Sequence, residues 1–266
     1  MQSLELRKSG PKYDRMFTLV DEKMNFVSQR THPRLSLVTV LFAPEASPFS
    51  PYPSVLLINA PGMSMHFVEM LKRELMSDQD ENLTRRIMIH GNVCPGIDTG
   101  DENANWFSKF LGQPVRLIQQ VSRLPRKRTS SVLGLEIEVT FADGYPLLVA
   151  TTASLHDLNT RIIAYEGDAV PMSRFRPNIV ISGAQAYNED VWNELVVQDA
   201  VLKGANKCVR CSITTVDQQT AEAGKEPLKM LAKYRRNKEN GVEFGRNFII
   251  SEPGLISVGD TIKLKS

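Results

Sequence analysis

The strongest constraint on the fold is a succession of short segments rich in apolar and β-branched residues, separated by glycine, proline and small polar residues. This spacing is typical of sheets and barrels rather than of helical bundles. Around Glu136 and Glu138 the charged and apolar residues alternate, as in a strand with one buried face. We predict strands at residues 16–20, 35–40, 55–58, 86–90, 115–118, 135–139, 147–150, 212–216, 248–250, 255–258 and 262–264.

Helical periodicity is sparse by comparison. For one helix, Asp101 is a candidate N-cap and Gly112 a candidate stop. For a second helix, Ser154 opens a Ser-x-x-Asp pattern that resembles a capping box. For a third helix, Pro227 suits the first turn. We therefore predict helices at residues 67–75, 101–111, 154–162 and 227–234, and loops at 43–53 and 78–84.

Together these elements predict a β-rich α+β fold in two domains. A smaller N-terminal β-rich domain is expected at residues 1–122, and a C-terminal β-barrel domain at residues 132–266. Residues 123–131 form the connector in this prediction. The surrounding run 122–131 is basic and has no aromatic residues, so we expect a solvated connector rather than a nucleic-acid site.

Composition narrows the class of protein further. The 266 residues are 42% hydrophobic, which is ample for a core, and the net charge of +2 calls for neither nucleic acid nor an anionic membrane as partner. No apolar run approaches the roughly 18 residues of a membrane span. The first residues lack the apolar region of a signal peptide, and the three cysteines are an odd number. We therefore expect reduced thiols and a cytoplasmic location, or a mitochondrial one if a longer form carries an anchor.

Two of the cysteines, Cys208 and Cys211, lie in a Cys-Val-Arg-Cys motif. A thiolate is a soft metal ligand, and the guanidinium of Arg210 is expected to lower a neighbouring thiol pKa. A structural zinc site is not expected, because the chain has no second paired motif to complete four ligands. A thioredoxin-like dithiol would need a helix after the motif, where we predict a strand. A pair of buried, inert cysteines remains an alternative.

Arginine pairs suggest a second type of chemistry. Pro177 should hold Arg176 extended, so that Arg174 and Arg176 would share one face of a strand, with Asn178 continuing the row. Two guanidinium forks on one face suit a phosphate monoester. The alternative is that these arginines pair with acids such as Glu189 and Asp190. Arg15 likewise has a structural alternative, a surface ion pair with Asp14 or Glu22.

Several ordered motifs resemble the MOSC family, the molybdenum-cofactor domains named after the C-terminal part of molybdenum cofactor sulfurase, and within it the amidoxime-reducing components and their bacterial relatives. The matching stretches span most of the chain. They are Tyr13-Asp14-Arg15, 29–34 (Gln-Arg-x-His-Pro-Arg), 173–183 (Ser-Arg-Phe-Arg-Pro-Asn-Ile-Val-Ile-Ser-Gly), 189–192 (Glu-Asp-x-Trp), 208–217 (Cys-x-Arg-Cys-x-x-Thr-Thr-Val-Asp), 226–235 (Glu-Pro-Leu-x-x-Leu-x-x-Tyr-Arg), 244–247 (Phe-Gly-x-Asn) and 258–260 (Val-Gly-Asp).

The resemblance implies a MOSC β-barrel with a smaller MOSC N-terminal domain, and a molybdenum cofactor (Mo-molybdopterin). It implies that Cys211 is the molybdenum ligand and the catalytic centre, with Cys208 only its neighbour. The positions implied to bind the cofactor are Arg15, Gly144, Tyr145, Arg176, Asn178, Val209, Arg210 and Asn247. The family's opening strand with its Tyr-Pro-x-Lys-Ser motif has no counterpart before Tyr13, so we expect the first barrel strand to be missing.

In function, the resemblance implies a reductase of small N-hydroxylated substrates of the amidoxime type. Its electrons would come from a b-type cytochrome and an NADH-dependent reductase. The alternatives are a non-catalytic carrier of the molybdenum cofactor, a sulfur-transfer MOSC protein, and a degenerate member of the family. No nucleic acid and no membrane span in this chain are expected.

Overall fold

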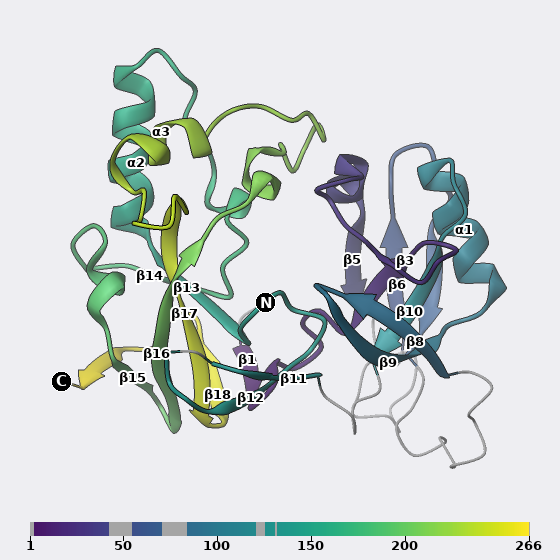
Figure 1. The fold of residues 1–266 in the computed structure, drawn as a ribbon, viewed down its shortest axis with the longest axis horizontal. Helices are drawn as coiled ribbons and strands as arrows, with labels where there is room; N and C mark the ends of the chain where they lie inside the picture. The colour runs from purple at the N-terminus through teal and green to yellow at the C-terminus, as the bar shows by residue number, and fades with distance from the viewer. Residues whose placement is uncertain (1–2, 43–54, 71–83, 121–125, 131, 266) are drawn as a thin grey trace. The chain divides into compact units, whose positions relative to one another are not determined.

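The computed structural model describes residues 3–42, 55–70, 84–120, 126–130 and 132–265, and divides into two compact units (Figure 1). Unit 1 consists of residues 1–14, 126–217 and 223–266, and unit 2 of residues 15–125 and 218–222. Both units are β-rich, so the predicted fold class is correct. No helix in the described part of the chain is both long enough and apolar enough to cross a bilayer.

In its described residues, unit 2 contains two antiparallel sheets and the α-helix α1. Its five-stranded sheet has the order β4-β3-β10-β9-β8, and its three-stranded sheet the order β5-β6-β7. Helix α1 (Asp101–Leu111) ends at Gly112, whose left-handed φ of 72° agrees with the predicted stop, although Gly100 rather than Asp101 is the N-cap. The strands are β3 (Phe17–Val20), β4 (Phe26–Val27), β5 (Thr39–Phe42), β6 (Val55–Asn59), β7 (His66–Glu69), β8 (Thr84–Ile89), β9 (Asn92–Asp98) and β10 (Arg116–Gln120).

Unit 1 is organised around a six-stranded sheet of order β14-β13-β17-β16-β15-β19, in which only the β13–β14 pair is parallel. Smaller sheets are formed by β18-β1-β2 and by β11-β12. The strands are β1 (Ser3–Arg7), β2 (Gly10–Pro11), β11 (Arg126–Thr129), β12 (Glu136–Val139), β13 (Leu147–Thr151), β14 (Ile179–Ile181), β15 (Glu194–Val197), β16 (Ala200–Val209), β17 (Glu243–Glu252), β18 (Gly254–Ser257) and β19 (Ile262–Lys265).

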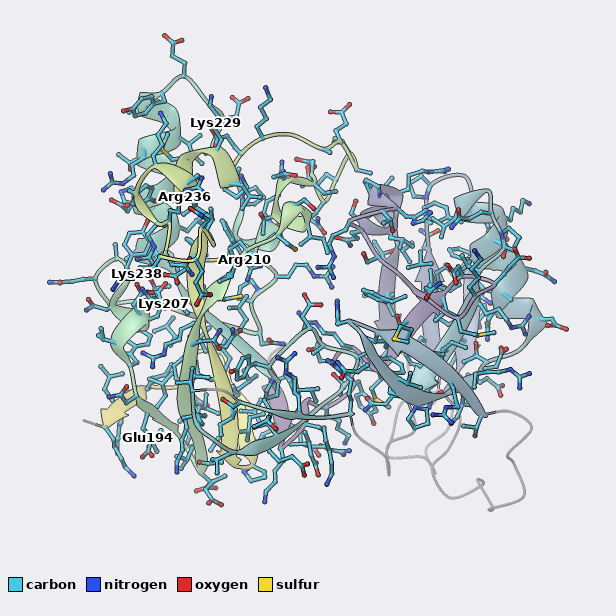
Figure 2. The ribbon with its side chains drawn as sticks, viewed as in Figure 1. Glu194, Lys207, Arg210, Lys229, Arg236 and Lys238 are labelled. Carbon is cyan, nitrogen blue, oxygen red and sulfur yellow. The ribbon has the colours of Figure 1, made fainter. Side chains whose placement is uncertain are left out.

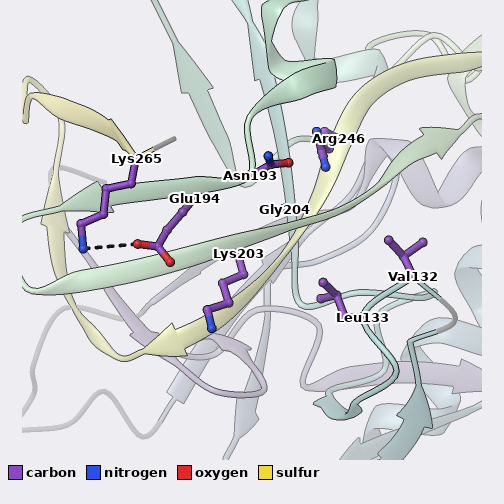
Figure 3. Close-up of a pocket in the computed structure, with 8 residues that line it drawn as sticks. All are labelled: Val132, Leu133, Asn193, Glu194, Lys203, Gly204, Arg246 and Lys265. Carbon is purple, nitrogen blue, oxygen red and sulfur yellow. Dashed lines mark ion pairs between the residues drawn. The ribbon is translucent and has the colours of Figure 1, made fainter.

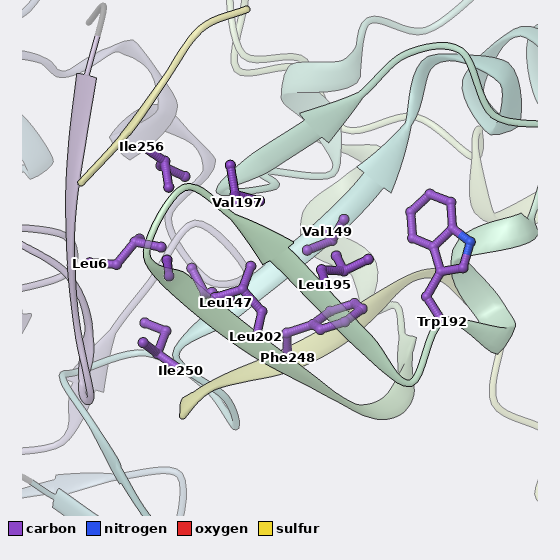
Figure 4. Close-up of a cluster of buried hydrophobic side chains, with 11 residues drawn as sticks. Leu6, Leu147, Val149, Trp192, Leu195, Val197, Leu202, Phe248, Ile250 and Ile256 are labelled. Atoms are coloured by element: carbon purple, nitrogen blue, oxygen red, sulfur yellow. The ribbon is translucent and has the colours of Figure 1, made fainter. Parts of the chain in front are cut away.

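The core of unit 1 lies on the inner face of the large sheet. It contains Leu195, Leu202 and Phe248, which are fully buried, with Trp192 at its margin (Figure 4). A second cluster is formed where α2 (Thr152–Ala164) packs against α3 (Leu228–Tyr234) through Leu158 and Leu231. Because apolar burial is the main stabilising term in folding, these two clusters hold the sheet and its connecting loops in place.

Three predicted elements are wrong. Residues 33–37 form a 3-10 helix (Pro33–Leu37) rather than the start of a strand, because Pro33 occupies its first turn. Residues 66–69 form strand β7 instead of beginning a helix, and residues 71–75 lie outside the described residues. Residues 212–216 were predicted as a strand, but Ser212–Thr215 is a 3-10 helix.

The beginning of α2 also differs from the prediction. Its N-cap is Thr151, whose Oγ1 accepts a hydrogen bond from the Ser154 backbone N–H at 3.1 Å. Ser154 instead uses its hydroxyl to donate to the carboxylate of Glu189, at 2.7 Å to Oε1. The capping-box prediction therefore placed the helix start too late, since the buried Glu189 needed this hydroxyl as a donor.

Part of the predicted solvated connector forms a strand, and the first residue of this strand, Arg126, is buried. Residues 126–129 pair with 136–139 as strands β11 and β12. Arg126 is only 5% exposed, and its guanidinium donates to the backbone carbonyls of Ala142 and Asp143. The prediction of solvent exposure is therefore wrong for Arg126, since neighbouring carbonyls replace the water that a charged side chain requires.

Candidate functional site

The Cys208–Cys211 motif lies where β16 ends and the 3-10 helix Ser212–Thr215 begins. Cys211 is the N-cap of this helix, with extended backbone (φ −111°, ψ 178°), and both cysteines are partly buried. The Thr214 hydroxyl donates to the Cys211 carbonyl at 3.0 Å, and the Thr215 hydroxyl donates to the Ser212 carbonyl at 2.7 Å. These side-chain hydrogen bonds hold the turn tight, and explain why β-branched residues did not continue the strand.

The guanidinium of Arg210 contacts Cys208, the first cysteine of the motif. Its Nη1 lies 2.8 Å from Cys208 Sγ, and its Nη2 donates to the Phe175 carbonyl at 2.7 Å. Figure 2 shows Arg210 near the end of β16. Burial raises the pKa of the Cys208 thiol, and Arg210 opposes this only in part. Arg210 therefore lowers the pKa of the Cys208 thiol, as expected, but burial outweighs this contribution and the net shift is upward.

The predicted row of arginines does not form. Arg176 has a left-handed φ of 53° rather than an extended backbone, and its side chain is exposed. Arg174 is the last residue of a 3-10 helix (Met172–Arg174). Its side chain contacts the segment that follows Cys211, where Nη1 donates to the Thr215 carbonyl at 2.8 Å and Nη2 donates to Asp217 Oδ2 at 2.7 Å. The two arginines therefore do not form the extended row that the prediction required.

The acids expected as alternative partners of these arginines are engaged elsewhere. Glu189 is fully buried and accepts from the hydroxyls of Thr151 and Ser154. Asp190 forms an ion pair with Arg235 at 2.8 Å. Arg174 therefore follows neither prediction. It does not belong to a row of phosphate-binding forks, and its ion pair is with Asp217 rather than with Glu189 or Asp190.

Asn178 links three parts of unit 1. Its Oδ1 accepts from the Leu148 backbone N–H at 2.9 Å, and its Nδ2 donates to Asp14 Oδ2 at 3.0 Å. Leu148 is also the cross-strand partner of Asn247 in β17. The amide of Asn178 therefore fixes the position of β13 relative to the segment that follows Arg176.

The remaining predicted residues lie in both units. Gly144 and Tyr145 precede β13, and the Tyr145 hydroxyl lies 3.2 Å from Ser130 Oγ. Their neighbour Asp143 contributes to the raised pKa of Cys208, which places this turn near the cysteine motif. Val209 ends β16 and is 51% exposed. Arg15 belongs to unit 2, where it has a left-handed φ of 50°.

Within unit 1, then, the segments carrying Arg176, Arg210 and Cys211 are joined by direct hydrogen bonds. Sequence reasoning missed the residues that join them, namely the carbonyls of Phe175 and Thr215 and the carboxylate of Asp217. Two of these contacts use backbone carbonyls, for which a sequence carries no signal. The signal for Asp217 was its place at the end of a hydroxyl-rich run, which did not reveal its partner.

The described residues contain no cluster of three or more His, Cys, Asp or Glu side chains suited to holding a metal ion. A cavity of about 500 Å³ lies elsewhere in unit 1 (Figure 3). Burial lowers the pKa of Arg246 in its wall, where the guanidinium is held by the carbonyls of Ala205 and Asp190. None of the predicted site residues lines this cavity, whose walls are Val132, Leu133, Asn193, Glu194, Lys203, Gly204, Arg246 and Lys265.

Comparisons with known proteins match both halves of the chain. The family model of the MOSC domain matches residues 136–263, and that of the MOSC N-terminal beta barrel domain matches residues 1–114. Mitochondrial amidoxime-reducing component 1 of Homo sapiens is 32% identical, with 97% of this chain and 74% of the relative covered. Mitochondrial amidoxime reducing component 2 of Rattus norvegicus is 33% identical, with 96% of this chain and 74% of the relative covered. Mitochondrial amidoxime-reducing component 1 of Mus musculus is also 33% identical, with 94% of this chain and 72% of the relative covered. The chain therefore belongs to the MOSC family, with the mitochondrial amidoxime-reducing components among its relatives.

Proposed function

We propose that this chain is a molybdenum-dependent oxidoreductase that reduces small N-hydroxylated compounds of the amidoxime type. Two observations support the proposal. The relatives at 32–33% identity are named amidoxime-reducing components. The single structural observation that carries it is the hydrogen bond from Arg210 to the Phe175 carbonyl, which joins the segment of the proposed metal ligand Cys211 to that of the proposed phosphate ligand Arg176.

The residues present fit a molybdenum–pterin cofactor. Cys211 is a partly exposed thiol, and sulfur is a soft ligand suited to such a metal. The Nε of Arg210, the residue before Cys211, is buried without an acceptor among the described residues. Buried donors of this kind are normally paired, and a cofactor rich in acceptor atoms meets that need.

In this proposal each residue has a separate task. Cys211 would hold the metal, and Arg176 would bind the phosphate of the cofactor, because a guanidinium group keeps its charge when water is excluded. Asn178 and Asn247 would lie along the pterin, while Gly144 and Tyr145 would contact it mainly through backbone, with Val209 and Arg210 beside the metal ligand. When bound, the molybdenum supplies oxygen-atom transfer, and the protein supplies ligand, orientation and charge.

The electron donors in this proposal are a b-type cytochrome and an NADH-dependent reductase. The relatives are named mitochondrial, whereas a cytoplasmic location was expected for this chain, and the location stays a prediction. Localisation of the chain in cells of its source, by fractionation, distinguishes the two compartments.

Metal content tests the proposal directly. The wild-type chain and the variants Cys211→Ser and Cys208→Ser are expressed in a host that makes the cofactor, and molybdenum per chain is measured together with pterin fluorescence after oxidation. We expect near-stoichiometric molybdenum in the wild type and in Cys208→Ser, and a loss of about tenfold or more in Cys211→Ser because a metal–thiolate bond is removed. Cys208 is the matched control, since it is a second partly buried cysteine three residues away.

Activity then separates the enzyme from a carrier. Loaded wild-type protein, supplied with electrons from a reduced dye, should convert benzamidoxime to benzamidine. Molybdenum without this conversion would support the non-catalytic carrier instead. A wild-type protein that is folded but holds no molybdenum in this host would contradict the proposal, and equal metal in Cys211→Ser would contradict the ligand assignment.

A further inference from the structure

Arg174 makes contacts that no binding role explains. Its side chain is 13% exposed, and its two terminal nitrogens are both committed to the segment that follows Cys211. Thr215 is the last residue of the 3-10 helix, and its carbonyl accepts a hydrogen bond from Nη1 at 2.8 Å. Nη2 pairs at 2.7 Å with Asp217, which lies just beyond the helix. A planar fork that satisfies both a carbonyl and a carboxylate fixes the end of this helix in two directions.

Arg210 makes the reciprocal contact at the other end. It precedes Cys211, and its Nη2 reaches back to the Phe175 carbonyl, in the residue next to Arg174. Phe175 itself is fully buried and stacks on Phe244 with ring centroids 3.9 Å apart, so the acceptor is anchored in the core. Each segment therefore contributes one arginine to the other, and the two contacts enclose Cys211.

We infer that Arg174 is a positioning residue that, together with Arg210, fixes the backbone of the Cys211 segment in the geometry needed for metal binding. The helix of the Cys211 segment is a single 3-10 turn, a type of helix in which hydrogen-bond geometry is poor. Its backbone bonds from Thr214 N–H to the Cys211 carbonyl and from Val216 N–H to the Ile213 carbonyl are 3.2 Å long, and the hydroxyls of Thr214 and Thr215 close it from within. The two arginines hold its ends, so without them we expect the turn to open more readily.

The energetic balance of Arg174 supports a role beyond stability. Its Nε is buried with no acceptor among the described residues, which costs stability because a buried donor is left unpaired. An aliphatic side chain at position 174 would avoid that cost and could still fill the space, but it could not hold both Thr215 and Asp217. The guanidinium is therefore the part of this side chain that fixes the end of the Cys211 segment.

Hydrogen exchange of the full chain tests the inference without cofactor. Mass spectrometry follows the amides of residues 211–217 in the wild type and in Arg174→Gln, Arg174→Lys and Asp217→Asn. We expect Thr214 and Val216 to exchange about tenfold faster in Arg174→Gln, since a hydrogen bond to a charged group is lost. Arg174→Lys should be intermediate, because one ammonium replaces a fork. Asp217→Asn should accelerate exchange less than Arg174→Gln, because the bond to Thr215 remains.

The matched control is Arg235→Gln. The Arg235 side chain is as little exposed as that of Arg174, at 13%. The substitution removes its ion pair with Asp190 and its hydrogen bond to the Glu243 carbonyl, both outside residues 211–217. We expect this variant to leave their exchange at the wild-type rate. Wild-type exchange in Arg174→Gln, or the same acceleration in Arg235→Gln, would overturn the inference. If Arg174→Gln does not fold, Arg174→Lys and Asp217→Asn decide the question in the same way.

A second readout addresses the metal site itself and rests on the proposed function. In cofactor-loaded protein, Arg174→Gln and Arg174→Lys should change the electron paramagnetic resonance spectrum of reduced molybdenum, while Arg235→Gln should not. An unchanged spectrum in both Arg174 variants would count against a positioning role. A wild-type protein without molybdenum would defeat the proposed function alone, because the exchange measurement still decides whether Arg174 fixes the segment.

Discussion

At the scale of single residues, Asp157 shows how one carboxylate organises its surroundings. Arg161 Nε donates to its Oδ2 at 2.8 Å, and the Tyr187 hydroxyl donates to the same oxygen at 2.8 Å. Tyr187 in turn lies 2.6 Å from the Tyr234 hydroxyl, on α3. The hydrogen bond from Arg161 is the main cause of the lowered pKa of Asp157, and burial opposes it. The charged form of Asp157 therefore connects α2 to α3 and to the loop before β15.

This lowered pKa predicts a pH-dependent contribution to stability. Because the folded pKa lies below the unfolded one, the stabilisation is present above about pH 4 and is lost as the pH falls through the folded value. Asp157→Asn should lower the free energy of unfolding by about 1–2 kcal/mol at neutral pH, and by much less at about pH 3. Urea unfolding at both pH values measures the difference. A difference of the same size at both pH values would contradict this account.

At the scale of secondary-structure elements, the N-terminus of α2 is tied into the interior. Thr151 caps the helix and also donates to Glu189 Oε2 at 3.1 Å, while Ser154 donates to both carboxylate oxygens. All three side chains are fully buried. A buried carboxylate is tolerated only with such donors, so the start of the helix and the burial of Glu189 depend on each other.

Thr151→Ala is expected to destabilise the protein by about 2 kcal/mol, since it removes a helix cap and a donor to a buried carboxylate. Thermal or urea unfolding measures the change. Thr160→Ala is the matched control in the same helix. Thr160 is exposed and its hydroxyl donates only to the His156 carbonyl at 2.9 Å, so its loss should change stability by less than about 0.5 kcal/mol. Equal effects of the two substitutions would show that the cap is unimportant.

At the scale of the whole molecule, each unit has a core of its own. Trp106 and Phe110 belong to a buried cluster of unit 2, and Trp192 to the cluster of unit 1. The chain contains two tryptophans, so each unit carries one natural fluorescent reporter. Phe110 is 2% exposed and stacks near Trp106 with ring centroids 6.0 Å apart.

Phe110→Ala should therefore act mainly on unit 2. Deleting a buried phenyl ring leaves a cavity and costs about 3–5 kcal/mol. Urea unfolding is monitored through Trp106 in a Trp192→Phe background and through Trp192 in a Trp106→Phe background. We expect a large fall in the midpoint for Trp106 and a smaller one for Trp192. Identical shifts for both reporters would mean that the chain unfolds as one cooperative unit.

The sequence alone determined the β-rich class, the strands with a clear apolar pattern, and the family. Residues 135–139 and 147–150 were recognisable because burial on one or both faces of a strand leaves a local pattern. Gly112 was recognisable because a left-handed residue ends a helix. The family motifs likewise pointed to Cys211, whose role remains a proposal.

Only the tertiary structure decided how the residues around Cys211 are used. Thr214 and Thr215 have strand-forming side chains, yet their hydroxyls close a 3-10 turn whose ends are held by Arg174 and Arg210. Arg174 and Arg176 do not share a face, because Arg176 adopts a left-handed backbone. These outcomes depend on backbone carbonyls and on partners more than thirty residues away, which local sequence patterns do not encode.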